Sequence, residues 1–184
     1  MRPKAATLSG RRVSLRPPAM ADYEELTALV RRSRRFHRGF IAMPIKNRKQ
    51  FADYVKRSPA GDKFRFLICR NSDGAVVGSI GLFHIVRLSL QSGVVGYMVG
   101  APFARQGFAT EALQLVLRFA FKTLKLHRVE ANIQPNNAAS IALVKRLGFR
   151  CEGCSPRYLK IQGKWRDHER WAILNENWRP QRTR

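Results

Sequence analysis

Acidic side chains are scarce in this chain of 184 residues, which has 12 Asp and Glu against 35 Lys and Arg and so a formal net charge of +23. Cysteine is scarce as well: three residues do not make the even-numbered framework of a disulfide-rich secreted domain, and they fit a reducing compartment. No apolar run approaches the roughly 20 residues of a membrane span, and the first seven residues lack the apolar core of a signal peptide. These absences predict a cytoplasmic protein without membrane association.

Length and composition favour one domain. With 45% apolar residues, the chain is long enough for a single well-packed core and short for two. No repeat, low-complexity tract or linker interrupts it. We therefore expect one domain over residues 1–184, with a core from about 10 to about 178 and a short basic tail at each end.

Cys151 and Cys154 form a C-x-x-C pair, a pattern found in metal and redox sites. A zinc site needs further ligands at matching spacing, and the chain has no second pair. A thioredoxin-like site needs the pair at the start of a helix rather than in a strand-like context. We therefore expect ordinary thiols and no bound metal.

Arginine is abundant, and its densest cluster follows the first expected helix. The cluster consists of Arg31, Arg32, Arg34, Arg35 and Arg38. One interpretation is a solvated surface in a chain of biased composition. The other is a patch that docks on RNA, the ribosome or another acidic surface, since a strongly positive field attracts polyanions.

Apolar periodicity predicts seven strands and four helices. The strands are 12–16, 64–70, 76–85, 93–99, 128–133, about 151–161 and 167–174. The helices are a first one from about 22 to 30, a short one around 51–55, a long one over 110–126, and one after Pro135-Asn136-Asn137 that ends at Gly148. This order of elements predicts an α/β (α+β) fold with a mixed sheet.

The stretch from Phe103 to Thr110 lies between the strand 93–99 and the longest helix. Gly107 permits backbone conformations that a side chain forbids, so successive N–H groups can converge on an anion. The unpaired amides and the positive end of the helix would complete a phosphate site. A plain strand-to-helix turn has the same pattern, so this feature alone leaves both interpretations open.

Seven stretches of the sequence together carry a family resemblance. They are Val13–Pro17, Gly96–Val99, Gln106–Ala112, Leu126–Asn132, Asn137–Ser140, Leu147–Phe149 and Tyr158–His168. With them the chain resembles, from about Gly10 to Trp178, the GNAT superfamily of acetyl-CoA-dependent N-acetyltransferases. Within it the chain is most similar to the bacterial ribosomal-protein N-terminal alanine and serine acetyltransferases. The resemblance implies a mostly antiparallel mixed sheet of about seven strands, flanked by about four helices, with a splayed fourth and fifth strand.

The resemblance also implies a site for acetyl-CoA as co-substrate. The family's phosphate-binding loop maps to Ala104–Ala109, where Ala104 replaces a Gln or Arg and Arg105 can supply charge. The strand at Tyr97–Val99 would pair with the pantetheine arm. The implied cofactor-binding residues are Tyr97, Met98, Val99, Arg105, Gln106, Gly107, Phe108, Ala109, Thr110 and Asn137.

Acetyl transfer needs a donor to the oxyanion and a group that stabilises the leaving thiolate. The implied oxyanion donor is the backbone amide near Met98 or Val99. Many relatives use a tyrosine for the thiolate, but this chain has Val144 at that position. Ser140, one helical turn earlier, is the catalytic candidate, and its alternative role is that of an ordinary residue in the first turn of its helix.

The general base is missing from its usual place, because Val94 stands where relatives commonly carry glutamate. Glu130, Asp167 and His168 are alternative bases that could act through water, and each can equally serve structure. At pH 7 roughly 10 to 15% of an α-amine is neutral, against less than about 0.1% of a lysine amine. An enzyme without a strong base therefore suits a protein N-terminus better than a lysine, with direct transfer of the acetyl group.

Two other functions stay open at this point. A small-molecule acetyltransferase would act on an aminoglycoside, polyamine or other amine, although few acidic residues are available to hold a polycation. A catalytically weak, RNA-associated basic module would bind acetyl-CoA without turnover. The oligomeric state has no signal in the sequence.

Overall fold

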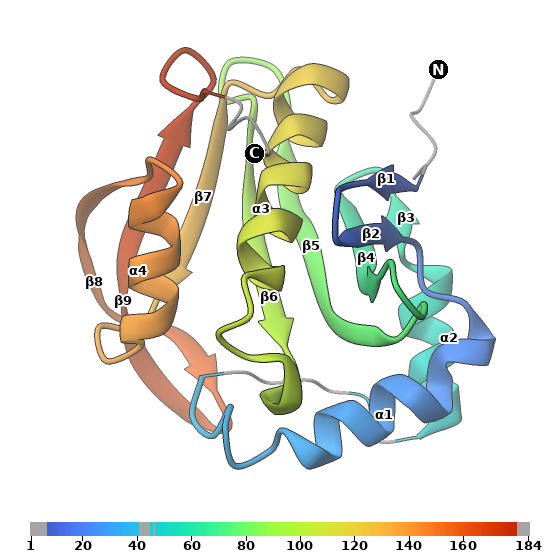
Figure 1. The fold of residues 1–184 in the computed structure, drawn as a ribbon. Helices are drawn as coiled ribbons and strands as arrows, with labels where there is room; N and C mark the ends of the chain where they lie inside the picture. Colours follow the sequence, from blue (N-terminus) through green and yellow to red (C-terminus); the bar gives the residue numbers. More distant parts are fainter. Residues whose placement is uncertain (1–6, 41–44, 46, 180–184) are drawn as a thin grey trace.

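The computed structural model describes residues 7–40, 45 and 47–179, and its strands form one nine-stranded sheet (Figure 1). The strands are β1 (Leu8–Ser9), β2 (Val13–Arg16), β3 (Pro59–Ala60), β4 (Lys63–Arg70), β5 (Val76–Val86), β6 (Ser92–Val99), β7 (Arg128–Ile133), β8 (Arg150–Ile161) and β9 (Lys164–Leu174). Their order is β1-β2-β4-β5-β6-β7-β9-β8, with β3 paired to β4. All seven predicted strands are present. The additional strands β1 and β3 have two residues each, which is too short for a periodic pattern.

Four α-helices flank the sheet, as predicted. They are α1 (Tyr23–Arg32), α2 (Arg48–Lys56), α3 (Phe108–Arg118) and α4 (Ala138–Arg146). Short 3-10 helices, η1 (Met20–Asp22) and η2 (Ala101–Phe103), precede α1 and α3. Within the described ranges, no helix combines the length and the apolar character that crossing a membrane requires.

The predicted helix 110–126 has two parts. It begins earlier, at Phe108, and the α-helical part ends at Arg118. A π-helical turn, η3 (Phe119–Thr123), follows it, and in this turn Leu124 N donates to Phe119 O over 2.9 Å. The wider turn changes the angular step between residues, and Phe119 and the next two side chains within it are buried.

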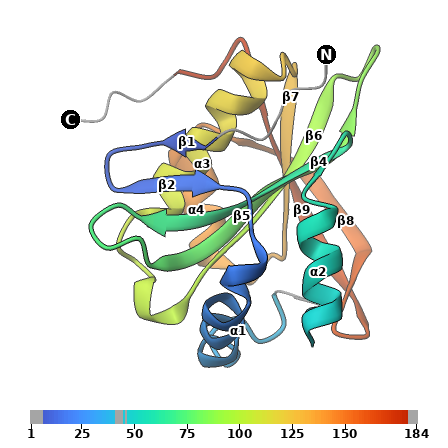
Figure 2. The same ribbon diagram turned by 90° about the vertical axis from the view of Figure 1, so that its right-hand side faces the viewer.

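Helices cover both faces of the sheet, and each face has its own core (Figure 2). α3 and α4 pack over the larger core, to which Leu117 and Val144 belong. α1 and α2 pack over a smaller core that includes Leu29 and Phe51. The side chain of Met98 belongs to this second core, so alternate residues of β6 serve opposite faces.

β6 and β7 run parallel but pair over three positions only: Ser92 with Arg128, Gly93 with Val129, and Val94 with Glu130. Beyond Val94 and Glu130 the two strands continue to Val99 and Ile133 without pairing each other. Their carboxyl ends therefore diverge, which confirms the predicted splay. The separation leaves part of the β6 edge without a neighbouring strand, and a ligand with amide groups can pair with such an edge.

Candidate active site

A cleft of about 1160 Å³ opens where β6 and β7 diverge. Its lining comes from β4, β5, β6, β7 and β9, from α2 and α4, and from the segment after α1 and the loop into α3. It includes Ser140 and every predicted cofactor-binding residue except Gln106. Gln106 is exposed and directs its carbonyl to Arg12, whose Nη1 donates to it over 2.8 Å. In the described ranges, no group of three or more His, Cys, Asp or Glu is placed to hold a metal ion.

The loop before α3 has the geometry of an anion-binding turn. Arg105 and Gly107 have positive φ values of 60° and 83°, and the first main-chain bond of the helix runs from Glu111 N to Gly107 O over 3.2 Å. The N–H groups of Phe108, Ala109 and Thr110 therefore have no acceptor within the helix. Together with the positive end of α3 they form a cradle for a phosphate group.

Arg12, the residue just before β2, contacts this loop. Besides its bond to Gln106 O, its guanidinium lies over the Phe108 ring, 4.7 Å from the centroid, and its backbone N donates to Glu111 Oε1 over 2.9 Å. The Phe108 side chain is buried in the larger core, which anchors the first turn of α3. Sequence reasoning missed Arg12 because it lies 94 residues from the carbonyl that it binds.

The register of β6 decides which of its main-chain groups face the cleft. Gly100 N donates to Val77 O of β5 over 2.8 Å. In an antiparallel pair such contacts alternate along the strand, so Met98 also turns its N–H and C=O toward β5. Tyr97 and Val99 turn theirs away from β5, toward the cleft. Of the two predicted oxyanion donors, the orientation therefore favours the Val99 amide over that of Met98.

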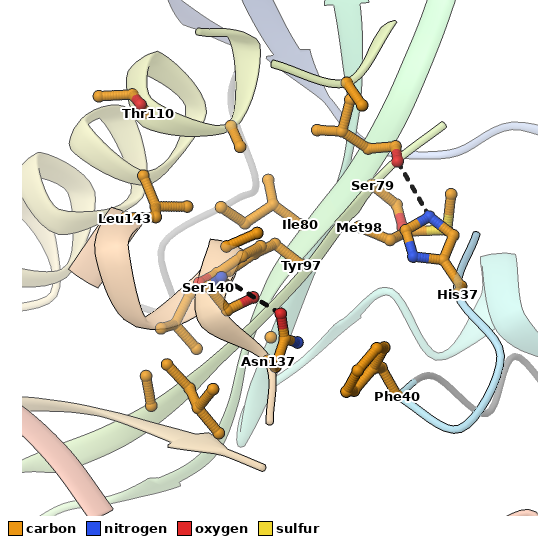
Figure 3. Close-up of a pocket in the computed structure, with 18 of the residues that line it drawn as sticks. His37, Phe40, Ser79, Ile80, Tyr97, Met98, Thr110, Asn137, Ser140 and Leu143 are labelled. Carbon is orange, nitrogen blue, oxygen red and sulfur yellow. Dashed lines mark hydrogen bonds between the residues drawn. The ribbon is translucent and has the colours of Figure 1, made fainter. Parts of the chain in front are cut away.

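His37 connects the segment after α1 to β6. Its Nε2 lies 2.9 Å from Val99 O, as the dashed line in Figure 3 marks. Because a carbonyl only accepts, Nε2 carries the hydrogen in this contact. Burial lowers the pKa of His37 from its ordinary value, and the hydrogen bond to Val99 opposes that effect. The contact fixes this side of the cleft, and no local sequence pattern indicated it.

The start of α4 presents Asn137 and Ser140 to the cleft (Figure 3). Asn137 is the N-cap, and its Oδ1 accepts from Ser140 N over 3.2 Å. The Asn137 Nδ2 group is therefore the part that can donate to a ligand. Val144, at the position of the family's tyrosine, is fully buried and does not line the cleft.

Tyr97 is the neighbour of Ser140 on β6. Burial raises the pKa of Tyr97 to about 12, and the Ser140 side chain acts in the opposite direction. The Tyr97 hydroxyl is buried, and no described atom has hydrogen-bond geometry to it. Since a buried hydroxyl requires a partner, a small rotation toward Ser140 Oγ would let Tyr97 donate to it and leave the Ser140 hydrogen for a ligand.

The described lining of the cleft contains no Asp or Glu. Glu130 instead pairs with Arg128 Nε at 2.8 Å and Arg170 Nη2 at 2.9 Å. Burial alone would raise the pKa of Glu130, but the hydrogen bonds from these two arginines lower it below its ordinary value. Asp167 is exposed and accepts from Arg157 N over 2.7 Å. Neither predicted carboxylate is placed to receive a proton in the cleft.

His168 is the one predicted alternative base that lines the cleft. It is only 3% exposed, and its Nδ1 lies 3.0 Å from Arg166 O. Asn132 and Gln134 line the same wall and were not predicted as site residues. Only the pairing of β7 with β9 brings them beside His168.

Strands that splay at the carboxyl end of a parallel pair, with two helix N-termini turned toward the gap, define an acetyltransferase site of the GNAT type. Residues 12–150 match the acetyltransferase (GNAT) domain, and the chain belongs to this family. It is an N-acetyltransferase that uses acetyl-CoA as its co-substrate, as the sequence predicted.

Individual relatives cover most of the chain. Over 175 residues it is 34% identical to the probable N-acetyltransferase YjcK of Bacillus subtilis (strain 168), covering 91% of this chain and 97% of that protein. Over 122 residues it is 34% identical to the ribosomal protein uS5-alanine N-acetyltransferase of Escherichia coli (strain K12), covering 66% of this chain but 63% of that enzyme. Mycobacterium smegmatis RimJ, solved in complex with CoA-disulfide, is similar with a TM-score of 0.85 and 29% identity, covering 94% of this chain and 88% of RimJ.

Proposed function

We propose that the acceptor is the N-terminal α-amine of a protein, a ribosomal protein being the first candidate. The observation that carries this proposal is the absence of a carboxylate from the described cleft lining, which does contain Arg65, Arg105 and Arg146. A polyamine or aminoglycoside would find no acidic group there to hold its charges. An α-amine is the natural acceptor for a site without a strong base, since roughly 10 to 15% of it is already neutral at pH 7, against less than about 0.1% of a lysine amine. The uS5-alanine specificity in the name of the E. coli relative supports the same choice.

The predicted cofactor-binding residues have distinct tasks in this proposal. The amides of Gly107 to Thr110 receive the pyrophosphate, with Arg105 adding charge. Tyr97 and Val99 offer main-chain groups to the pantetheine arm, and Asn137 Nδ2 donates to it. Gln106 contributes by shaping the loop, because its carbonyl is bound to Arg12.

Ser140 and the β6 backbone supply the catalytic groups. The Val99 amide stabilises the oxyanion that forms when the amine attacks the acetyl carbonyl. The Ser140 hydroxyl donates to the departing thiolate, and Tyr97 supports Ser140 from behind. The transfer is direct, because no cysteine lies in the described lining of the cleft to carry an acyl group.

We also propose that the chain forms one catalytic domain and that it acts in the cytoplasm. Support for a single domain comes from the one continuous sheet on which both cores pack. Support for the location comes from the thiols of Cys151 and Cys154, which are free and exposed, a state that a reducing compartment preserves.

The test combines binding with turnover. Isothermal titration with CoA should give saturable binding, and acetyl-CoA should yield free thiol with peptides that begin with Ala or Ser. The same peptides with a blocked N-terminus and an internal lysine should give no thiol, and neither should spermine. Turnover with spermine or with the blocked peptide would overturn the choice of acceptor, and binding without thiol release on any amine would leave a non-catalytic module.

The basic surface supports a second part of the proposal, an association with RNA around the acceptor. All five arginines of the Arg31–Arg38 cluster are exposed, and none of them forms an ion pair within the described ranges. A strongly positive enzyme is repelled by an isolated basic tail but attracted to a basic protein that is bound to RNA.

Changing Arg31, Arg34 and Arg35 together to Gln should weaken RNA binding and reduce its salt dependence, measured by fluorescence anisotropy. A control with the same loss of charge at the exposed Lys122, Lys125 and Arg150 should weaken it less. Transfer to a ribosomal protein should be faster when RNA is present at low salt. Equal rates with and without RNA, at low and high salt, would contradict the association.

A further inference from the structure

A row of polar side chains crosses β7 and β9 on the face of the sheet turned away from α3 and α4. Asn132 of β7 pairs directly with Arg170 of β9, and His168 lies two residues before Arg170 on the same face. The next cross-strand pair, Ala131 and Trp171, points to the opposite face and belongs to the larger core. Asn132 and His168 both line the cleft. Asn132 and His168 therefore belong to the wall of the cleft on the side away from β6, whereas Arg170 does not line the cleft.

Two atoms of this row are buried without a partner among the described residues. They are Asn132 Oδ1, which can only accept a hydrogen bond, and Arg170 Nε, which can only donate one. Arg170 is otherwise held in place: Nη2 donates to Glu130 Oε2 over 2.9 Å, and the guanidinium lies 4.7 Å from the centroid of the Tyr158 ring. Since Asn132 and Arg170 are direct cross-strand partners, a small rotation would let Arg170 Nε donate to Asn132 Oδ1, which leaves the Asn132 amide nitrogen to donate to a ligand in the cleft.

His168 completes the row with a free acceptor nitrogen. Its Nδ1 is 3.0 Å from the Arg166 carbonyl, which can only accept, so Nδ1 carries the hydrogen of the neutral ring. Nε2 then holds a lone pair. No hydrogen bond to Nε2 occurs within the described ranges, although the side chain is almost fully buried. The Arg166 contact thus selects the tautomer that can receive a proton.

We propose that Asn132 and His168 form the seat for the amino end of an acceptor peptide, with Arg170 orienting the Asn132 side chain. In this seat His168 Nε2 receives the proton of the attacking amine, and Asn132 Nδ2 donates to the first peptide carbonyl. This inference rests on the proposed function, which does not name the base or the side chains that hold the acceptor. A lysine side chain lacks a carbonyl at this distance from its nitrogen, so the seat selects a peptide N-terminus.

The proton and electron balance of the transfer is complete with this seat. The nitrogen lone pair forms the new C–N bond, and the bond between the acetyl carbon and sulfur breaks with its electron pair going to sulfur. His168 takes the proton that the nitrogen loses and later releases it to solvent. The Ser140 hydroxyl hydrogen-bonds to the thiolate, which takes its proton from solvent as it leaves, and the products are the N-acetylated peptide and a free thiol.

The charged or titratable groups around His168 in the described structure come from three strands and from the cleft. They are Tyr158 of β8, whose ring centroid is 6.1 Å away, Arg170 of β9, and Glu130 of β7, which pairs with Arg170 and Arg128. His37 and Arg65 belong to the same cleft. The transfer needs a lone pair on His168 Nε2 and on the amine nitrogen, so activity should rise with pH.

The first test is His168→Gln with an acceptor peptide beginning with Ala. The side chain stays polar and of similar size, and kcat should fall about 100-fold, a typical loss for a general base. The histidine ionisation should also disappear from the acidic limb of the kcat/KM profile. The affinity for CoA, measured by titration, should stay within about twofold of the wild type and shows that the variant is folded.

A second acceptor separates proton removal from a structural role. A peptide whose N-terminal residue is replaced by an aminooxyacetyl group has a weakly basic amine, which needs less help from a base. The 100-fold difference between wild type and His168→Gln should shrink to less than about tenfold with it. His127→Gln, at an exposed position at the far end of β7, is the control and should leave all of these rates unchanged.

Asn132→Ala tests the seat without changing the base. It should raise KM for the Ala peptide several-fold more than KM for a simple alkylamine, because only the peptide is held at both ends. Equal kcat and equal pH profiles in wild type and His168→Gln would overturn the seat while leaving the proposed function intact. A wild-type enzyme that binds CoA but acetylates no peptide would overturn the proposed function itself, and the seat with it.

Discussion

The two walls of the cleft are built in different ways. The cofactor wall, formed by β6, the loop into α3 and the start of α4, presents mainly backbone groups. The acceptor wall, formed by β7, β9 and the segment after α1, presents side chains such as Asn132, His168 and His37. Backbone groups tolerate many side chains, whereas a wall of side chains depends on each identity. The first wall therefore suits a ligand common to the whole family, and the second suits the acceptor of this enzyme.

Gly107→Val should break the cofactor wall and have the largest effect. A valine at φ +83° is strained by roughly 1–3 kcal/mol, and its Cβ would lie 3.4 Å from Arg12 Nη1. The loop would have to rearrange, so CoA affinity in isothermal titration should fall by at least about 100-fold. Gly74→Val is the matched control, with a φ of +73° and no atom within 4 Å of its Cβ. It should lose stability but bind CoA normally, and unchanged affinity in Gly107→Val would refute the phosphate cradle.

Ser140→Ala should separate catalysis from cofactor binding on the same wall. The cap from Asn137 Oδ1 to Ser140 N involves the main chain and survives the change. We expect kcat to fall about 100-fold with CoA affinity unchanged, since only the donor to the thiolate is lost. Ser79→Ala, which removes a cleft hydroxyl on β5, should have little effect. Comparable losses in the two variants would show that Ser140 has no special role.

Arg12→Ala should weaken the cofactor wall from outside the cleft. The change removes the hydrogen bond to Gln106 O and the guanidinium over Phe108. Each contact is worth about 1 kcal/mol, so CoA affinity should fall roughly 5- to 20-fold while kcat at saturating acetyl-CoA stays the same. Arg11→Ala, at the exposed neighbouring position, should retain the wild-type affinity. A larger loss in Arg11→Ala would place the support of the loop elsewhere.

His37→Gln tests the acceptor wall by its effect on the free energy of unfolding, and we expect this effect to be the smallest of the four. Burial lowers the pKa of His37 below its ordinary 6.5, so the unfolded chain binds this proton at a higher pH than the folded one. The stabilisation is complete above pH 6.5 and decreases as the pH falls from there toward the folded pKa. In urea unfolding, the variant should lose less stability than the wild type over this range, with a difference within about 1 kcal/mol. Identical pH dependence in both proteins would contradict a buried neutral ring.

Local patterns explain how far the sequence predicted the fold. Gly148, predicted as a helix end, has a φ of +87° just after α4, and Asn137 caps α4 within its own helical turn. Such features depend on residues three or four apart, so they are visible in one dimension. The π-helical turn after Arg118 was not predicted, because three consecutive buried residues also occur in the regular part of α3, at Leu115 to Leu117, so burial does not mark the turn.

Contacts between distant segments explain what was missed in the site. Arg12 meets the α3 loop and His37 meets β6 across 94 and 62 residues. The orientation of the Met98 main chain toward β5, which favours Val99 among the two predicted oxyanion donors, follows from the register of two strands. Neither kind of relation leaves a periodic or local mark in the sequence.

By itself, the sequence determined the family, the order of the elements and the end of α4 at Gly148, and it pointed to the loop before α3 as the candidate phosphate site, because each depends on neighbours along the chain or on motifs of a few residues. Tertiary structure alone decided which groups share the acceptor wall. The pairing of β7 with β9 places Asn132 beside Arg170 and both near His168, and the divergence of β7 from β6 opens the space in front of them. The physical reason is that strand register and strand separation are set by packing over the whole sheet, and the two cores on its opposite faces determine that packing together.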